Sequence, residues 1–256
     1  MKEIPVANSG LRMLTILLVA VLMPAAPASA QRVRIAVTAN FTVAAQEIGA
    51  WFAQATGHET LYSFGSTGQL YAQITQGAPF EVFLAADRAR PEKAVAAGLA
   101  VAGSRFTYAR GRLALFSRDK SLVTDETTLR DPSIAKIAVA NLLTAPYGAA
   151  AVAVLKALGV YDALAPRIVR GNNIAQTYQF VATGNAELGF VALSQIVRHR
   201  EGSRWLVPEH LHPALAQDAV LLRRGVDNQA ARRFMAFLRG PQAAAVKTSY
   251  GYGAGD

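Results

Sequence analysis

Patterns typical of strands and helices alternate along nearly the whole chain after residue 30, and this alternation constrains the fold most strongly. Short apolar or β-branched runs such as Val33–Thr38 are each followed by a segment whose apolar residues have helical spacing. Such alternation predicts parallel strands joined by crossover helices, which is an α/β fold. The expected strands are 33–38, 61–64, 82–85, 111–117, 137–140, 188–192 and 218–222, and the expected helices are 42–52, 67–75, 92–99, 146–158, 174–182, 228–238 and 242–250.

The strand and helix units form two successive series and a short terminal one, with no Pro-, Gly- or Ser-rich linker between them. This organisation predicts two lobes, each a mostly parallel sheet flanked by helices, with a hinge of two strands near Leu115 and Val220. We expect residues 31–114 and 219–256 in the first lobe and residues 115–218 in the second.

The first 30 residues have the features of a secretory signal peptide. Lys2 and Arg12 precede an apolar run at 13–26, and small residues follow at 28–30. Prolines interrupt the run, and a membrane-spanning helix needs about 20 apolar residues. We therefore expect cleavage after Ala30 and export to the periplasm, which leaves a chain of 226 residues.

Composition excludes several classes of function. The absence of cysteine excludes zinc–thiolate sites and thiol nucleophiles. The formal net charge of the whole chain is +9, and the basic residues are scattered without interleaved aromatic residues. This distribution does not favour nucleic-acid binding, and it is compatible with weak steering of small anions. We expect a monomer that does not bind nucleic acid.

Four junctions between an expected strand and an expected helix carry short polar residues, a Pro or a Gly, and none of them contains a charged residue. Helix N-termini at the carboxyl ends of parallel strands bind anions. Neutral donors favour a fully ionised guest over a protonated one such as hydrogen phosphate, whose O–H needs an acceptor. Ordinary helix capping is the alternative interpretation of each junction taken singly. The junctions are 38–42, 63–68, 144–148 and 171–174.

The sequence around these junctions resembles the molybdate-binding periplasmic protein family, which has the type II periplasmic binding fold. The most specific match runs from Ser63-Phe64-Gly65-Ser66-Thr67-Gly68 through Gly77-Ala78-Pro79-Phe80-Glu81-Val82-Phe83 to Ala86-Asp87. Glu81 stands where the family usually has Asp. Ala145-Pro146-Tyr147-Gly148 and Gly240-Pro241-Gln242 are also similar to the family pattern.

The resemblance implies a site for a tetrahedral oxyanion, molybdate or tungstate, with no cofactor and no metal cation. It assigns donors to the Asn40 amide, to the Thr67 hydroxyl with Ser66 beside it, and to the backbone N–H groups of Tyr147 and Ile174. Many relatives have a Tyr where this chain has Ala192, and we expect Ser194 to substitute for that donor. The implied partner is the permease of an ABC importer.

Two alternatives compete with this interpretation. A binding protein for another oxyanion such as sulfate would have a similar site. An exported hydrolase is disfavoured, because neither a nucleophile elbow nor a phosphate-binding loop is present and the histidines lie away from the junctions. His210 and His212 lack a spaced third metal ligand. We therefore predict that the chain is not an enzyme.

Overall fold

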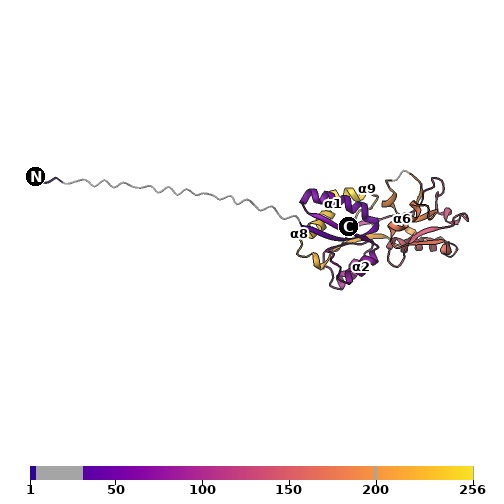
Figure 1. Ribbon diagram of the computed structural model, residues 1–256, viewed down its shortest axis with the longest axis horizontal. Coiled ribbons are helices and arrows are strands. Elements are labelled where there is room, and N and C mark those ends of the chain that lie inside the picture. The colour runs from indigo at the N-terminus through magenta and orange to yellow at the C-terminus, as the bar shows by residue number, and fades with distance from the viewer. Residues whose placement is uncertain (4–30, 199–200, 256) are drawn as a thin grey trace.

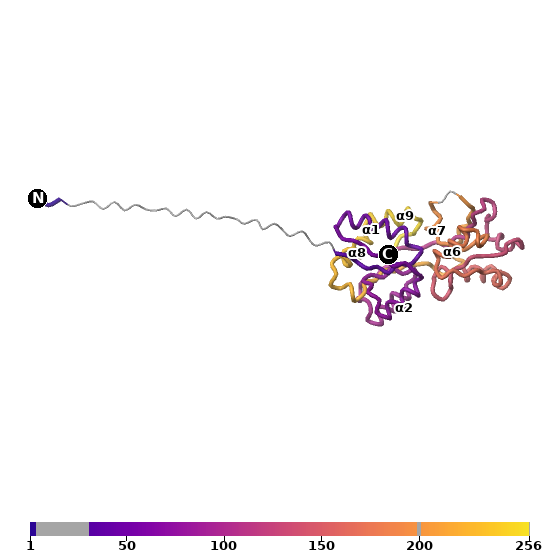
Figure 2. Tube along the Cα trace, in the orientation of Figure 1, coloured from indigo at the N-terminus to yellow at the C-terminus, as the bar shows by residue number. Residues whose placement is uncertain are grey.

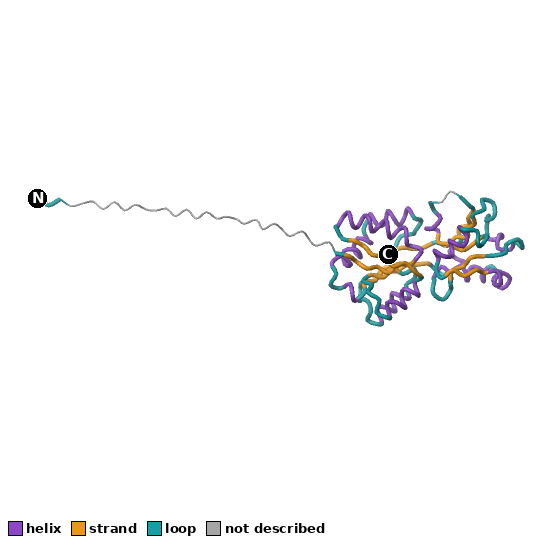
Figure 3. Tube along the Cα trace, in the orientation of Figure 1, coloured by secondary structure: helices purple, strands orange, loops and turns teal. Residues whose placement is uncertain are grey.

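The computed structural model describes residues 1–3, 31–198 and 201–255, so nearly all of the predicted signal peptide, and also His199, lie outside the described residues. Two five-stranded sheets lie in two lobes, with strands inside and helices outside (Figures 1 and 3). This architecture confirms the predicted two-lobed α/β fold class. The segment that follows residue 31 and the C-terminal segment lie together in one lobe, and the middle of the chain forms the other (Figure 2).

The first lobe is built on a sheet with the strand order β2-β1-β3-β10-β4. Strand β1 pairs in parallel with β2 and β3, whereas β10 is antiparallel to β3 and β4. Helices α1, α8 and α9 pack on one face and α2 and α3 on the other. The elements are β1 (Arg32–Thr38), the short turn η1 (Ala39–Phe41), α1 (Thr42–Thr56), β2 (Glu59–Gly65), α2 (Thr67–Thr75), β3 (Val82–Leu84), α3 (Ala89–Ala96), β4 (Phe106–Gly111), β10 (Leu215–Leu221), α8 (Gln229–Arg239) and α9 (Pro241–Ser249).

The second lobe is built on a sheet with the order β7-β6-β8-β5-β9, in which β6 pairs in parallel with β7 and β8. Residues of α4 and α5 join the larger core on one face, and residues of α6 and α7 pack on the other. The elements are β5 (Leu113–Ser117), β6 (Ile137–Ala140), α4 (Pro146–Ala157), α5 (Tyr161–Leu164), β7 (Ile168–Gly171), α6 (Ile174–Ala182), β8 (Leu188–Ala192), α7 (Leu193–Ile196) and β9 (Ser203–Leu206).

The chain passes from the first sheet to the second through a single residue, Arg112, which separates β4 from β5. It returns in the segment between β9 and β10. Leu115, expected at the first crossing, pairs with Phe190 inside the second sheet. Val220, expected at the second, pairs with Phe83 inside the first sheet. Both sheet changes therefore occur in connecting segments before these strand positions.

All seven expected helices are present, with ends shifted by a few residues. The expected strand 111–117 is interrupted at Arg112, and β4, β7 and β9 were not predicted. Strands β7 and β9 are edge strands of four residues, and both are partly exposed. Neither needs the continuous apolar run of a central strand, so the sequence pattern does not mark them.

Among the described residues no single helix is long and apolar enough to cross a membrane; the segments Pro146–Ala157 and Tyr161–Arg167, bent by 120° at their junction, pass that test only as a pair.

Candidate ligand-binding site

The predicted junctions lie where the two lobes face each other. In the first lobe β1 leads into η1 and α1, and β2 leads into α2; in the second lobe β6 leads to α4 and β7 to α6. The backbone N–H of Gly68, at the start of α2, donates to the carbonyl of Thr144 across the lobes at 2.8 Å. Helix α6 also contacts η1. The lobes are therefore closed on each other at these junctions.

The residues predicted for the site are nearly all buried in this closed arrangement. Asn40, Ser66, Thr67, Tyr147, Ile174 and Ala192 are each at most 4 % exposed, and Ser194 is half-buried. A ligand held among them is thereby shielded from water. Electrostatic attraction and hydrogen bonds are stronger in such a low-dielectric environment.

Helices α4 and α6 begin where the second lobe contacts the first, α4 against β10 and α6 against η1. Helix α4 starts with Pro146, whose missing N–H costs nothing there, and the N–H groups of Gly148 and Ala149 donate to Ala145. At α6 the Asn173 side chain accepts from Gln176 N at 3.0 Å. The N–H groups of Tyr147 and Ile174 lie in first turns, where no intrahelical acceptor exists. The positive end of each helix dipole adds to their attraction for an anion.

A chain of hydrogen bonds engages the side chains of Thr67 and Asn40. The Thr67 hydroxyl accepts from Ala86 N at 3.0 Å and donates to Thr38 Oγ1 at 3.2 Å. Thr38 donates its own hydrogen to Asn40 Oδ1 at 2.9 Å. Asn40 Nδ2 donates to Gln217 Oε1 at 3.0 Å and to the Tyr252 hydroxyl at 3.1 Å. The donor hydrogens of both predicted side chains are thus used within the protein.

Ser194 also makes a contact inside the protein. Its hydroxyl donates to the carbonyl of Asn40 at 2.9 Å, which joins α7 of the second lobe to the first lobe. The Tyr252 hydroxyl lies 2.7 Å from the same carbonyl. Ala192 occupies the position where many relatives have a Tyr donor. Its N–H donates to Gln195 Oε1 at 2.9 Å, and its side chain packs in the core of the second lobe.

Ser66 is the exception among the predicted side chains. Its Oγ is buried at the N-cap of α2, and its hydroxyl hydrogen has no acceptor among the described residues. Thr144 Oγ1, on the facing loop of the second lobe, is also buried without a hydrogen-bond partner among the described residues. Buried hydroxyls are nearly always satisfied, so an unpartnered one beside two helix starts indicates a place for an external acceptor.

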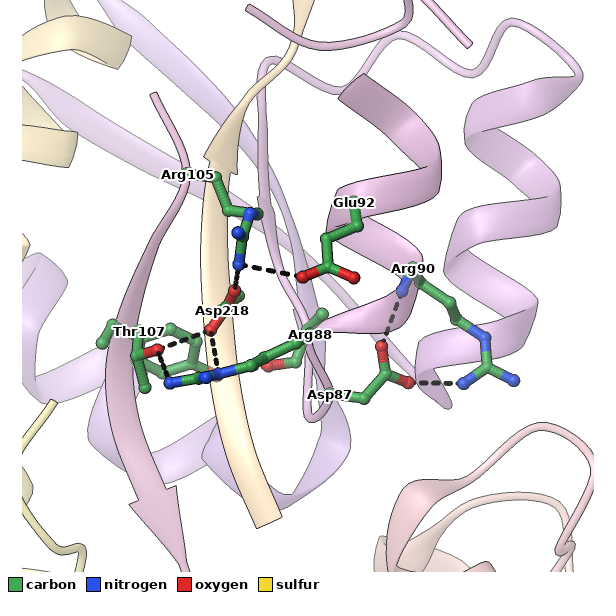
Figure 4. A network of polar contacts seen from close by, with 9 residues as sticks. Asp87, Arg88, Arg90, Glu92, Arg105, Thr107 and Asp218 are labelled. Carbon is green, nitrogen blue, oxygen red and sulfur yellow. Dashed lines mark hydrogen bonds and ion pairs between the residues drawn. The ribbon is translucent and has the colours of Figure 1, made fainter. Parts of the chain in front are cut away.

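Two aspartates near the junctions, Asp218 and Asp87, are paired with guanidinium groups (Figure 4). Asp218, fully buried on β10, contacts Arg105 and accepts from Thr107 Oγ1 at 2.9 Å, and Arg88 Nε lies 3.7 Å away. Arg90 pairs with Asp87 and also donates to the carbonyl of Leu143 in the second lobe at 2.9 Å. The buried carboxylate next to the site is thereby compensated by guanidinium groups.

The tyrosines near the site are neutral donors over a wide pH range. Burial is the largest cause that raises the pKa of Tyr108, Tyr147 and Tyr252 above the usual value. Their hydroxyls therefore stay protonated at neutral pH and add no negative charge where an anion would bind.

Sequence reasoning missed the polar residues that come from distant parts of the chain. Gln217, Tyr108 and Tyr252 join the network from such distant positions. Thr38 and Thr144 lie inside the predicted junctions 38–42 and 144–148, but their hydroxyls were given no role. One signal was present in the sequence: Gln217 and Asp218 are the only polar residues in Leu215–Leu221, a strand that is buried along its whole length. A polar side chain at such a position needs a specific partner.

Comparisons with known proteins agree with this geometry. Residues 33–253 match the family of bacterial extracellular solute-binding proteins. The chain is 51 % identical to the molybdate-binding protein ModA of Rhodobacter capsulatus, covering 89 % of this chain and 90 % of that one. It is 50 % identical to ModA of Azotobacter vinelandii, covering 90 % and 92 %.

The solved structure of the Azotobacter vinelandii periplasmic molybdate-binding protein has a TM-score of 0.84, with coverage of 86 % of this chain and 98 % of that one. A sulfate-binding protein from Mycobacterium tuberculosis, at 11 % identity and a TM-score of 0.72, shares the fold alone. These relatives are binding proteins, which supports the prediction that the chain is not an enzyme. The chain belongs to the bacterial extracellular solute-binding protein family, within its group of ModA molybdate-binding proteins.

Proposed function

We propose that this protein captures molybdate in the periplasm and delivers it to the permease of an ABC importer. The observation that carries the proposal is the Ser66 hydroxyl, which is buried without a partner at the helix starts where the two lobes meet. The identity of about half of all residues with the ModA relatives supports the choice of ligand. The ligand is cargo and no cofactor is needed.

The donor set we propose differs in detail from the one implied by sequence resemblance. Ser66 would contribute its hydroxyl, whereas Asn40 and Thr67 would contribute backbone N–H groups, because their side-chain hydrogens are already used. Tyr147 and Ile174 would contribute backbone N–H groups from the second lobe. Ser194 would act between the lobes through its bond to the Asn40 carbonyl.

Neutral donors explain how such a site would select its ligand. A dianion with four acceptor oxygens can accept from every donor, whereas a protonated oxyanion needs an acceptor at its O–H. Tungstate has nearly the same shape as molybdate, so we expect it to bind as well. Sulfate is smaller, and a cage closed at a fixed separation of the lobes would hold it less well.

We further propose that binding closes the two lobes around the ligand and that the closed form docks on the permease. The moving bodies would follow the sheets, with residues 31–111 and 215–255 in the first lobe and the described residues of 113–206 in the second. The chain would act as a monomer that does not bind nucleic acid, released from its signal peptide by cleavage after Ala30.

Calorimetry tests this function directly. The protein is purified from the periplasm, unfolded and refolded to remove ligand, and titrated with molybdate, tungstate, sulfate and phosphate. We expect heat of binding with molybdate and tungstate and none with phosphate. Heat with none of the four would overturn the oxyanion proposal, and tight binding of sulfate without molybdate would assign the protein to a different ligand. Ser133→Ala, an exposed serine of the second lobe, serves as a control that should bind like the wild type.

A further inference from the structure

Gln217 has an unusual position in the first lobe. It lies on β10, is fully buried, and sits where the pairing of β10 with β4 shifts its register. An unpaired amide in such a place costs about 1 to 3 kcal/mol, so its partners reveal why the residue is there.

The Gln217 amide makes three side-chain hydrogen bonds. Its Oε1 accepts from Asn40 Nδ2 and from the Tyr108 hydroxyl, both at 3.0 Å. Its Nε2 donates to the Tyr147 hydroxyl at 3.2 Å. Asn40 and Tyr108 belong to the first lobe, whereas Tyr147 belongs to the first turn of α4 in the second. One side chain therefore connects a first-lobe junction to a second-lobe junction.

The crossing between the lobes leaves space for this connection. Gly111 ends β4 directly before the crossing residue Arg112. A Cβ at position 111 would lie 2.1 Å from the Tyr147 hydroxyl and 2.5 Å from Gln217 Nε2. The hydrogen bond between Gln217 and Tyr147 thus occupies the volume that any side chain at position 111 would take. It therefore lies beside Arg112, where the chain first crosses between the lobes.

We propose that Gln217 is a positioning residue for ligand binding, one that fixes the Asn40 loop of the first lobe and the start of α4 in the second lobe at a set separation. It holds the Asn40 amide in one orientation and anchors Tyr147 through its hydroxyl, so that the backbone N–H groups of both residues face the same ligand. This inference rests on the proposed function, since the ligand is the one proposed above. Gln217 itself would not touch the anion.

A double-mutant cycle tests this role. Gln217→Met keeps the volume and removes the amide, and Tyr147→Phe removes the hydroxyl while keeping the backbone N–H. Tyr147→Phe is expected to weaken molybdate binding by about 5-fold, the range of one hydrogen bond, and Gln217→Met by about 5-fold or more because it also releases Asn40. If Gln217 acts through Tyr147, the double variant should lose no more than Gln217→Met alone. A loss equal to the product of the two single losses, about 25-fold or more, would overturn the inference.

Tyr108→Phe is the matched control. It removes a tyrosine hydroxyl that is equally buried and that donates to Gln217 Oε1, whereas Tyr147 accepts from Gln217 Nε2; the Tyr108 bond stays within the first lobe. We expect a lower melting temperature and an affinity within about 2-fold of the wild type, because no bond between the lobes is lost. Equal losses of affinity in Tyr108→Phe and Tyr147→Phe would show a general packing effect and contradict the positioning role.

Gln217→Glu adds a readout that remains useful if Gln217→Met folds poorly. A protonated carboxyl is nearly isosteric with the amide and can donate to Tyr147, and an ionised one can accept from the Tyr147 hydroxyl, although its charge repels the dianion. Gln217→Glu and Gln217→Glu/Tyr147→Phe carry this carboxyl alike, so the repulsion cancels when the two are compared at one pH. We expect Gln217→Glu to bind molybdate about 5-fold more tightly than Gln217→Glu/Tyr147→Phe, and equal affinities would overturn the inference. If the wild type binds molybdate but the effects of Gln217→Met and Tyr147→Phe are additive, the proposed function stands and the positioning role of Gln217 is wrong. If the wild type does not bind molybdate, both the proposed function and the positioning role are wrong.

Discussion

The first lobe approaches the ligand site with a connected set of polar side chains, whereas the second lobe approaches it mainly with helix starts. Thr38, Asn40, Thr67 and Gln217 are buried and bonded to one another in the first lobe. The side chains of Tyr147 and Ile174 pack in the core of the second lobe, with the Tyr147 hydroxyl bonded to Gln217, and only their backbone N–H groups would face the ligand. The comparison indicates that binding in the first lobe depends on side-chain identity and in the second on the placement of the backbone.

The largest effect is expected from Gly68→Ala, which would separate the two lobes. A Cβ at position 68 would lie 2.9 Å from Thr144 Cα and 3.1 Å from the Thr144 carbonyl, so the nearest backbone obstacles are in the other lobe. If full closure fails, the second-lobe donors are lost, and we expect binding to weaken by about 3 kcal/mol or more, ~150-fold. Calorimetry with molybdate measures the loss.

The control for this change lies in the same junction. A Cβ at Gly65, the last residue of β2, would meet only the side chain of Leu70 in α2 of the same lobe, at 3.4 Å or more. Gly65→Ala should therefore keep its affinity. The unfolding free energy of Gly68→Ala should not fall, because Ala favours helices over Gly by up to about 1 kcal/mol. A destabilised Gly68→Ala variant with normal affinity would mean that the junction matters for folding and not for closure.

A smaller effect is expected from Ser66→Ala, and it should differ in kind from that of its neighbour. Ser66 is the N-cap of α2, so the change should cost the ligand-free protein about 0.5 to 1 kcal/mol. It also removes one donor to a charged ligand, worth about 2 kcal/mol or ~30-fold in affinity. Thr67→Val keeps the shape but removes the acceptor of Ala86 N and the donor to Thr38, so we expect a loss of stability of about 1 to 3 kcal/mol.

Thermal unfolding without ligand and calorimetry with molybdate separate the two outcomes. The assignment of donors in the first lobe predicts that Ser66→Ala loses mainly affinity and Thr67→Val mainly stability. The reverse pattern would return the donor role to the Thr67 side chain and would contradict the proposed use of Ser66.

The same contrast explains how much the sequence predicted. The alternation of strands and helices was sufficient to place the junctions, because parallel strands bring their carboxyl ends to one edge of the sheet. It did not show which hydroxyls are free. Asn40 bonds to Gln217 and Tyr252, which are 177 and 212 residues away. A serine or threonine at a helix start looks the same in sequence whether its partner is the protein or a ligand.

The division into lobes shows a related limit. The interruption at Arg112 and the short edge strands β7 and β9 depend on pairing with distant strands, so local pattern does not reveal them. The helices were easier to predict because their apolar spacing and their Pro or Asn at the start are local signals, as at Pro146 and Asn173.

The smallest effect on binding is expected from Ile174→Val in the second lobe. The Ile174 side chain is 3 % exposed and packs in the core of its lobe, while its N–H is the proposed donor. Losing one methylene should cost about 0.5 to 1.5 kcal/mol of stability. The backbone N–H remains, so the affinity for molybdate should stay within about twofold of the wild type, less than the loss of a single hydrogen bond. Ile137→Val, in the same core at the start of β6, gives the matched loss of stability without proximity to the site. A tenfold loss of affinity in Ile174→Val, with stability equal to that of Ile137→Val, would mean that the second lobe also binds through side-chain shape and would remove the distinction between the lobes.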